Sequence, residues 1–346
     1  MLSLARKRIV LIGGAGFIGH HLALALAKQG AQVEIIDSLQ VNNLFSFTSD
    51  NAQIINRQMY LHIIGERLRL LREAGVPVNV QDARDYHALG RLISRIKPQI
   101  VIHLAAVAHA DRSNKDPYST FDHSLRTLEN ALDSTRDRVE HFIYFSSSMV
   151  YGNFTSGRVN EETPCEPLGI YGALKFAGEK IVIAYHQVFK LPYTIIRPSA
   201  LYGERCVSRR VGQIFIENAI QGLDISISGN GSDRLDFTYI GDLVDGVIKV
   251  FENENSKNQI FNLTYGESRS IHEMADILKQ YFPNVKIHHL PQDELMPNRG
   301  TLSIEKAKRL LEYSPNYPLE KGFVEYIQWY KSVGAFQTAD STGRNP

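Results

Sequence analysis

The stretch "GGAGFIG", residues 13–19, constrains the fold more than any other feature of the chain. It follows the apolar run "RIVLI" and opens a segment with helical periodicity, so it is expected to be the turn between a strand and a helix. Gly13, Gly16 and Gly19 allow a tight turn and let backbone N–H groups approach a pyrophosphate, which the helix dipole also attracts. The pattern therefore predicts a dinucleotide-binding loop.

Acidic residues after the next strands bear on which dinucleotide is bound. Asp37 ends the second apolar run, where a carboxylate accepts hydrogen bonds from the adenosine ribose and repels a 2′-phosphate, so NAD is favoured over NADP. The alternative for Asp37 is a solvated turn residue. Asp82 follows a further short strand and could contact the adenine amino group, although a helix cap at Asp82 or Asp85 is an alternative.

Strand-like and helix-like segments alternate through the first 200 residues. Near-continuous apolar runs typical of buried parallel strands occur at 8–14, 32–37, 100–106, 141–147 and 193–199. Helical patterns occur between them at 16–29, 85–96, 117–136 and 170–189. This alternation predicts an α/β fold with a doubly wound parallel sheet, a Rossmann fold. The segment 43–75 lengthens the second crossover and has no assigned function.

The pattern changes after about residue 200. We expect residues 1–200 to form an NAD-binding domain and residues 201–335 to form mainly a smaller substrate-binding domain. Parts of residues 235–265 could return to the NAD-binding domain. The polar end, 336–346, is expected to be a flexible tail.

The charge balance argues against several classes of partner. Lys plus Arg number 38 against 37 for Asp plus Glu, so no net field favours nucleic acid or an anionic membrane. No apolar run approaches the roughly 18 to 20 residues of a membrane span. The opening is expected to be a strand rather than a signal peptide. Two cysteines are too few for a disulfide framework or structural zinc site, so we expect a cytoplasmic soluble protein without metal.

Candidate catalytic groups follow the strand expected at 141–147. "YGALK" places Tyr171 and Lys175 on one helix face, and "SSS" at 146–148 ends a strand, where ligands bind in parallel sheets. An isolated tyrosine phenol has a pKa near 10, so it keeps its proton at neutral pH and cannot act as a base. A nearby ammonium and the positive nicotinamide would lower that pKa. Without the dinucleotide loop, such a pair would most often be an exposed helix face.

Several motifs together resemble a known family, the NAD-dependent nucleotide-sugar epimerases and dehydratases of the extended short-chain dehydrogenase/reductase type. The matching stretches, in order, are "GGAGFIG", "VIHLAA", "SSSMVYG", "YGALK", "RPSALYG", "GNGSDRLDFTYIGDLVDG" and "SIEKAKRLL", and they cover the chain to about residue 333. The resemblance implies that Ser147 hydrogen-bonds the reacting sugar oxygen, Tyr171 exchanges its proton and Lys175 tunes Tyr171. It also implies a homodimer built from the helices at 117–136 and 170–189.

The resemblance implies binding residues as well. Arg234 and Arg299 would contact the diphosphate of a nucleoside-diphosphate sugar, with exposed or ion-paired arginines as the alternative. Ser148 and His109 would lie near the sugar. The cofactor-binding set is Gly13, Gly16, Phe17, Ile18, Gly19, Asp37, Asp82, Ala83, Leu104, Ala105, Ala106, Tyr171, Lys175 and Pro198.

Met149 narrows the expected reaction. Family members that dehydrate or decarboxylate sugars resemble one another in carrying an acid here, whereas this chain has Ser148 and Met149, and a thioether transfers no proton. Inversion at C4 needs no such acid, so a 4-epimerase is favoured. The alternatives are a dehydratase, a decarboxylase, a 2- or 3,5-epimerase, a keto-sugar reductase, or a non-catalytic NAD-sensing protein.

Other departures leave the nucleobase and sugar open. Ala200 stands where the family often has an Asn, and His123 and Arg126 stand where an Asn and a Gly are usual. His109, Asp111 and Arg112 could recognise a carboxylate or an unusual hexose, or only pair with one another. His103 is interpreted as a core position beside the cofactor.

Overall fold

The computed structural model describes residues 4–48, 55–107, 110–291 and 297–333. A seven-stranded sheet with all neighbouring strands parallel forms its centre, in the order β12-β7-β5-β4-β1-β2-β3. The expected doubly wound α/β fold is therefore confirmed. The strands are β1 (Arg8–Ile12), β2 (Gln32–Asp37), β3 (Val78–Val80), β4 (Ile100–His103), β5 (His141–Phe145), β7 (Tyr193–Arg197) and β12 (Gln259–Asn262).

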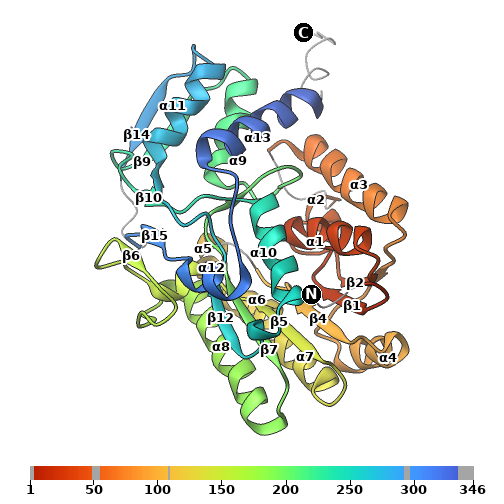
Figure 1. The fold of residues 1–346 in the computed structure, drawn as a ribbon. Coiled ribbons are helices and arrows are strands. Elements are labelled where there is room, and N and C mark those ends of the chain that lie inside the picture. Colours follow the sequence, from red (N-terminus) through yellow and green to blue (C-terminus); the bar gives the residue numbers. More distant parts are fainter. Residues whose placement is uncertain (1–3, 49–54, 108–109, 292–296, 334–346) are drawn as a thin grey trace.

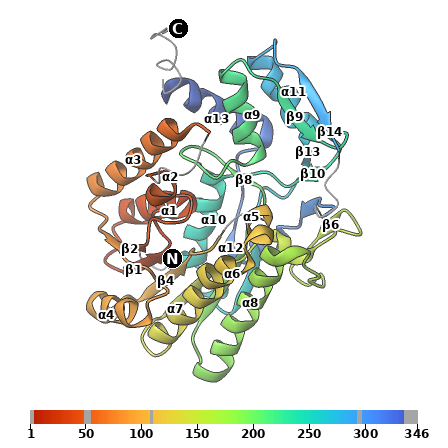
Figure 2. The same cartoon turned by 180° about the vertical axis from the view of Figure 1, so that it is seen from behind.

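Successive residues of β1 supply the two faces of the sheet. Ile9 and Leu11 belong to the apolar core beneath one helical layer, while Val10 and Ile12 belong to the core beneath the other. The two layers lie on opposite sides in Figures 1 and 2. The first contains α1 (Phe17–Lys28), α3 (Arg57–Glu73) and α10 (Ile240–Glu252), and the second contains α4 (Tyr86–Ile96), α7 (Thr127–Thr135) and α8 (Gly169–Phe189).

Elements after residue 200 build a second region at the carboxyl ends of the strands (Figure 1). Its helices are α9 (Val211–Ile220), α11 (Ile271–Tyr281), α12 (Glu305–Leu311) and α13 (Leu319–Val333). Its short pairs are β8 (Leu201–Tyr202) with β11 (Thr238–Tyr239), β9 (Ile225–Ser228) with β14 (Ile287–Leu290), and β10 (Arg234–Leu235) with β13 (Arg269–Ser270). A further pair joins β6 (Arg158–Val159) to β15 (Thr301–Leu302).

The remaining elements are short. They are α2 (Leu44–Thr48), α5 (Ala110–Lys115), α6 (Pro117–Phe121), the π-helix η1 (Asp122–Arg126), and the 3₁₀ helices η2 (Ser148–Tyr151) and η3 (Glu254–Ser256). The helix expected at 117–136 is thus three consecutive pieces, because a π-turn interrupts the α-helical hydrogen bonding. The expected strands at 8–14 and 100–106 end earlier, at Ile12 and His103, where the chain turns into loops that line the site.

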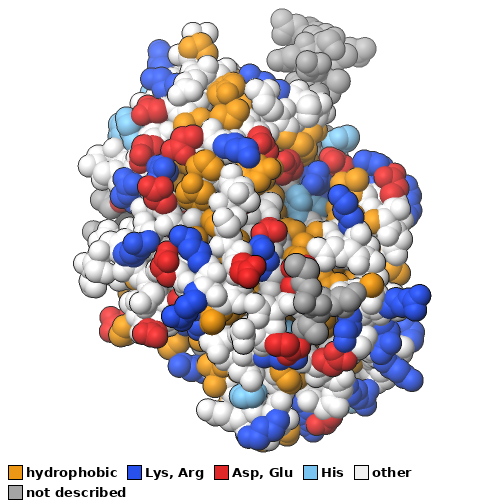
Figure 3. All heavy atoms as spheres, viewed as in Figure 1, with side chains coloured by type: hydrophobic (Ala, Val, Ile, Leu, Met, Phe, Trp, Pro, Cys, Tyr) orange, Lys and Arg blue, Asp and Glu red, His pale blue; other side chains and the backbone are white. Residues whose placement is uncertain are grey.

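The surface does not divide into regions of one charge. Basic and acidic side chains are interspersed over the face in Figure 3, as the near-zero net charge leads one to expect. Within the described ranges, no helix combines the length and the apolar character that a membrane crossing requires. The tail at 336–346 lies outside the described residues.

Candidate active site

The glycine loop lies on the wall of a partly open cavity of about 150 Å³ at the carboxyl ends of the strands. Gly13 has a φ of +77°, and a Cβ there would lie 2.6 Å from the backbone nitrogen of Ala105. A Cβ on Gly16, in contrast, would meet no described atom closer than the Gly13 carbonyl, at 3.5 Å. Internal packing therefore requires glycine at 13 but not at 16. The space left at Gly16, beside the first turn of α1, fits the close approach of a pyrophosphate.

Most of the expected cofactor residues meet at this cavity. Its wall includes Gly13, Gly16, Phe17, Ile18, Gly19, Asp37, Asp82, Ala83, Leu104, Ala105 and Ala106. It also includes residues that were not expected there from the sequence: Arg67, Thr127, Ser208 and Arg210. Tyr171, Lys175 and Pro198 belong to neighbouring elements rather than to this wall.

Asp37 is held by the backbone of two loops. Its Oδ2 accepts a hydrogen bond from the Ala15 N–H at 2.9 Å, and its Oδ1 accepts one from the Leu39 N–H at 2.7 Å. Burial raises the pKa of Asp37, while these hydrogen bonds and the charge of Arg67 act against that rise. Each carboxylate oxygen can accept a further hydrogen bond, so the group fits a ribose hydroxyl.

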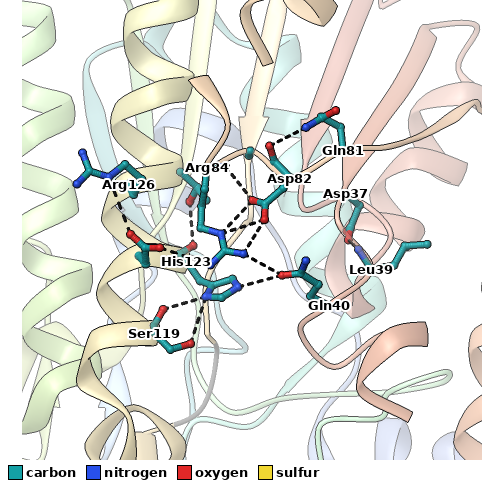
Figure 4. A network of polar contacts seen from close by, with 12 residues as sticks. Asp37, Leu39, Gln40, Gln81, Asp82, Arg84, Ser119, His123 and Arg126 are labelled. Carbon is teal, nitrogen blue, oxygen red and sulfur yellow. Dashed lines mark hydrogen bonds and ion pairs between the residues drawn. The ribbon is translucent and has the colours of Figure 1, made fainter. Parts of the chain in front are cut away.

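At the adenosine end, Asp82 belongs to the polar network of Figure 4. Arg84 donates to both Asp82 oxygens, with Nη2 at 2.6 Å from Oδ2. Burial raises the pKa of Asp82, but the hydrogen bonds from Arg84 outweigh it and the pKa lies below its ordinary value. Arg84 also reaches Gln40 at 3.1 Å, and the His123 ring lies 3.4 Å from the same Gln40 oxygen. The helix cap proves to be Asp85, which accepts from the Ala88 N–H.

Outside the cavity wall, a hydrogen bond brings Ser147 and Tyr171 together. Ser147 follows β5 and caps η2, where its Oγ accepts a hydrogen bond from the Met149 N–H at 3.2 Å. Burial raises the pKa of Tyr171, and the charge of Arg210 and a hydrogen bond with Ser147 act to lower it. The serine and the phenol therefore lie within hydrogen-bonding reach of each other, as a pair acting on one substrate oxygen requires.

Lys175 is buried one turn beyond Tyr171 on α8. Its Nζ donates to the Phe145 carbonyl at 2.7 Å, which ties the helix to the end of β5. Burial lowers the pKa of Lys175 to about 8, against the opposing charge of Glu179. The Lys175 amine therefore still carries its proton mostly at neutral pH, but it loses that proton more easily than a lysine in water does.

The residues around this pair also make contacts within the protein. Ser146 Oγ donates to Glu179 at 2.5 Å, and Glu179 in turn forms a buried ion pair with Arg197, at 2.6 Å. Ser148 is buried and its N–H donates to the Pro198 carbonyl. Tyr151 donates to Asn262 of β12 at 2.8 Å, in agreement with a packing role.

The two candidate diphosphate arginines lie in different surroundings. Arg234 is half-exposed, donates to the Ser268 carbonyl at 2.6 Å and pairs with Glu273 at 3.5 Å. Arg299 is half-buried, and its desolvation together with repulsion from Arg210 lowers its pKa to about 10, against attraction by Asp233. The structure thus groups Arg299 with Arg210 and Tyr171, and it leaves Arg234 in an ion pair.

Sequence reasoning missed Arg210, and it did so for a definable reason. Arg209 and Arg210 are adjacent and both precede α9, so no pattern distinguishes them. The structure does: Arg209 pairs with buried Glu217 at 3.5 Å, whereas Arg210 lines the cavity. His123 lies on the same wall, and His103 is buried on β4, as expected of a core position. His109 and the side chain of Asp111 lie outside the described residues.

Comparisons with known proteins show what the chain is similar to. The model of the NAD dependent epimerase/dehydratase family matches residues 9–264. A UDP-N-acetyl-alpha-D-glucosaminuronate decarboxylase of Bacillus cytotoxicus is 27% identical, over 95% of this chain and 99% of its own length. A UDP-glucuronate 4-epimerase of Arabidopsis thaliana is also 27% identical, over 95% of this chain and 78% of its own length.

Among solved structures, this chain is similar to UDP-glucuronic acid 4-epimerase from Bacillus cereus, in complex with UDP-glucuronic acid and NAD. The TM-score is 0.83 and the identity 25%, over 94% of this chain and 99% of that one. The cofactor of the chain is therefore NAD, in agreement with the prediction from Asp37.

Two glycine variants test whether the loop is shaped for the cofactor. Gly16→Ala should change the free energy of unfolding by no more than about 1 kcal/mol, because a Cβ there meets open space. It should weaken NAD binding at least ~10-fold through overpacking against the ligand. Gly13→Ala, the matched control, should instead destabilise the protein by about 2 kcal/mol or more. Urea unfolding and calorimetric NAD titration measure both; equal behaviour of the two variants would contradict the assignment.

The buried ammonium of Lys175 should be visible in the pH dependence of stability. Because its pKa is lowered to about 8 in the folded protein, the unfolded chain binds more protons between that value and the ordinary one near 10.5. The wild type should therefore gain stability relative to Lys175→Met as the pH rises from 8 to 10. Urea unfolding of both proteins across this range measures the difference, and a constant difference would show that the pKa is not lowered.

Proposed function

Because this chain belongs to the NAD dependent epimerase/dehydratase family, we propose that it inverts C4 of a nucleoside-diphosphate sugar, by way of a 4-keto sugar. NAD, when bound, supplies the hydride acceptor and donor for such a reaction. Ser147 would hydrogen-bond the C4 oxygen and hold it in place. Tyr171 would remove the hydroxyl proton and later return it, and Lys175 would position the phenol and the cofactor from the same face of α8.

The observation that carries the proposal lies in η2, where the two residues after Ser147 bear no carboxyl group. Met149 and Ser148 occupy η2, directly after Ser147. Among the described residues that line the cavity, the carboxylates are Asp37 and Asp82, and both serve the adenosine end. Elimination of water or proton transfer at C5 requires a further acid or base, whereas hydride return at C4 does not.

The guanidinium groups of Arg210 and Arg299 could bind the diphosphate of the substrate between them. Arg210 and Arg299 repel each other, and Arg299 is half-buried. An anion between them would relieve that repulsion and gain charge-assisted hydrogen bonds. We therefore propose that these two arginines hold the diphosphate and that Arg210 also stabilises the Tyr171 phenolate. Arg234 as a diphosphate ligand stays a prediction.

The decisive experiment is proton NMR of the protein with NAD in D2O, with UDP-sugars tried first because the relatives and solved structures are named for them. A C4-inverted product without deuterium at any carbon is the expected result. Deuterium at C3 or C5, a stable keto sugar, or release of carbon dioxide would mean that an acid or base outside the cavity wall enables another reaction. No turnover across UDP-, GDP-, CDP- and dTDP-sugars would favour a non-catalytic NAD-binding protein.

Removal of the phenol should abolish turnover without unfolding the protein. Tyr171→Phe is expected to lower kcat by about 10²–10⁴, the range for loss of a general acid–base group. Tyr151→Phe is the matched control, since its hydroxyl only joins Asn262. It should cost about 1 kcal/mol of stability and leave kcat within severalfold. Steady-state rates and unfolding curves of both variants measure this; an active Tyr171→Phe protein would refute the mechanism.

We further propose a homodimer. Large apolar side chains remain exposed on the segments that the family resemblance assigns to a dimer interface: Tyr118 and Phe121 on α6, and Val188 and Phe189 on α8. Light scattering on a sizing column should give twice the mass of the chain. Val188→Lys together with Phe121→Lys should shift it to the monomer by placing charges in an apolar contact. A monomeric wild type at micromolar concentration would contradict the proposal.

A further inference from the structure

Arg67 is a buried cation on the crossover segment to which the sequence assigned no function. It lies on α3, its residue is 1% exposed, and it lines the cofactor cavity. Its Nε donates to the Arg205 carbonyl at 2.8 Å, and its Nη2 donates to the same oxygen. Two of its three nitrogens are thereby used to hold the loop that follows β8.

The third guanidinium nitrogen of Arg67, Nη1, has no acceptor among the described residues, although this atom is buried. Burial lowers the pKa of Arg67 to about 10, so the guanidinium is still charged at neutral pH. Buried polar groups in folded proteins are nearly always paired, and charged ones especially so. An unpaired donor at a ligand cavity therefore points to a ligand atom as its partner.

The surroundings of Arg67 place it against the glycine loop. Its charge acts on His20 and His21 of α1, and the His20 Nδ1 lies 2.9 Å from the Gly16 carbonyl. Both histidines are kept neutral by burial and by the neighbouring arginines, with a pKa of about 3 for His21. Asp37, at the end of β2, attracts the guanidinium. The donor thus lies between the first turns of α1 and the end of β2.

We propose that Arg67 is a cofactor-binding residue whose Nη1 donates to a pyrophosphate oxygen of NAD. The pyrophosphate is the anionic part of the cofactor, and it binds at the N-terminus of the helix after the glycine loop. Gly16, Phe17 and Ile18 line the same cavity as Arg67. A guanidinium directed at that position adds a charge-assisted hydrogen bond to those from the backbone. The inference does not depend on which sugar reaction the protein performs.

The protein holds α3 in place by contacts remote from the cofactor. Tyr60 donates to buried Glu217 of α9 at 2.7 Å, and Asn56 donates to the same carboxylate at 2.9 Å. Apolar residues of α3, among them Ile63 and Ile64, pack in the core that also contains Leu22 of α1. Arg67 is therefore fixed in position by its helix, which reduces the entropy lost when it binds an anion.

The test compares ligands with and without the pyrophosphate. Calorimetric titrations with NAD, ADP-ribose and adenosine are carried out on the wild type and on Arg67→Met. The variant should bind NAD and ADP-ribose roughly 10- to 100-fold more weakly, as expected for loss of a hydrogen bond to a charged group, and bind adenosine unchanged. Undiminished ADP-ribose binding, or an equal loss for adenosine, would overturn the proposal.

Two further variants separate the guanidinium from the docking of its helix. Tyr60→Phe loosens the attachment of α3 to Glu217 but keeps Arg67, so its ADP-ribose affinity should stay within about threefold of the wild type, well short of the loss of a charged hydrogen bond. A loss as large as that in Arg67→Met would assign the effect to packing and overturn the proposal. If Arg67→Met does not fold, Arg67→Lys, which keeps the charge but not the fork of donors, should still bind ADP-ribose more weakly and adenosine normally.

Discussion

The geometry of the candidate active site depends on one buried ion pair, Glu179 with Arg197, whose side chains are 1% and 3% exposed. Glu179 is one helical turn beyond Lys175, on the face of α8 that carries the candidate catalytic groups, and Arg197 ends β7. Ser146, at the end of β5, donates to the same carboxylate. The pair therefore fixes a helix and two strand ends relative to one another. Because an uncompensated charge would remain, loss of either partner costs several kcal/mol.

Much of the site was predictable because its chemistry follows local rules. A strand, a glycine turn and a helix specify where a pyrophosphate lies, so Gly13, Gly16 and Asp37 could be placed from spacing alone. Helical periodicity likewise placed Tyr171 and Lys175 on one face of α8. The doubly wound sheet followed from the alternation of apolar runs with helical patterns, and the structure confirms it.

The residues that sequence reasoning missed act through contacts between distant segments. Arg67 and Arg210 approach the cavity from parts of the chain that no local pattern connects to the glycine loop. Arg234, chosen by motif, forms an ion pair with Glu273, a contact that the motif does not reveal. Ion pairs between residues that are distant in the sequence cannot be predicted from motif spacing, yet they decide which of several arginines faces a ligand.

The inserted helix α3 has a mechanical consequence for the whole chain. It leaves the sheet after β2, yet its polar contacts end on Glu217 of α9 and on the backbone at Arg205. The apolar core on that side is also continuous, running from β1 through α1 and α3 to α13. Neither region can open without exposing the core of the other, so heat or denaturant should melt the protein in a single cooperative transition rather than in two steps.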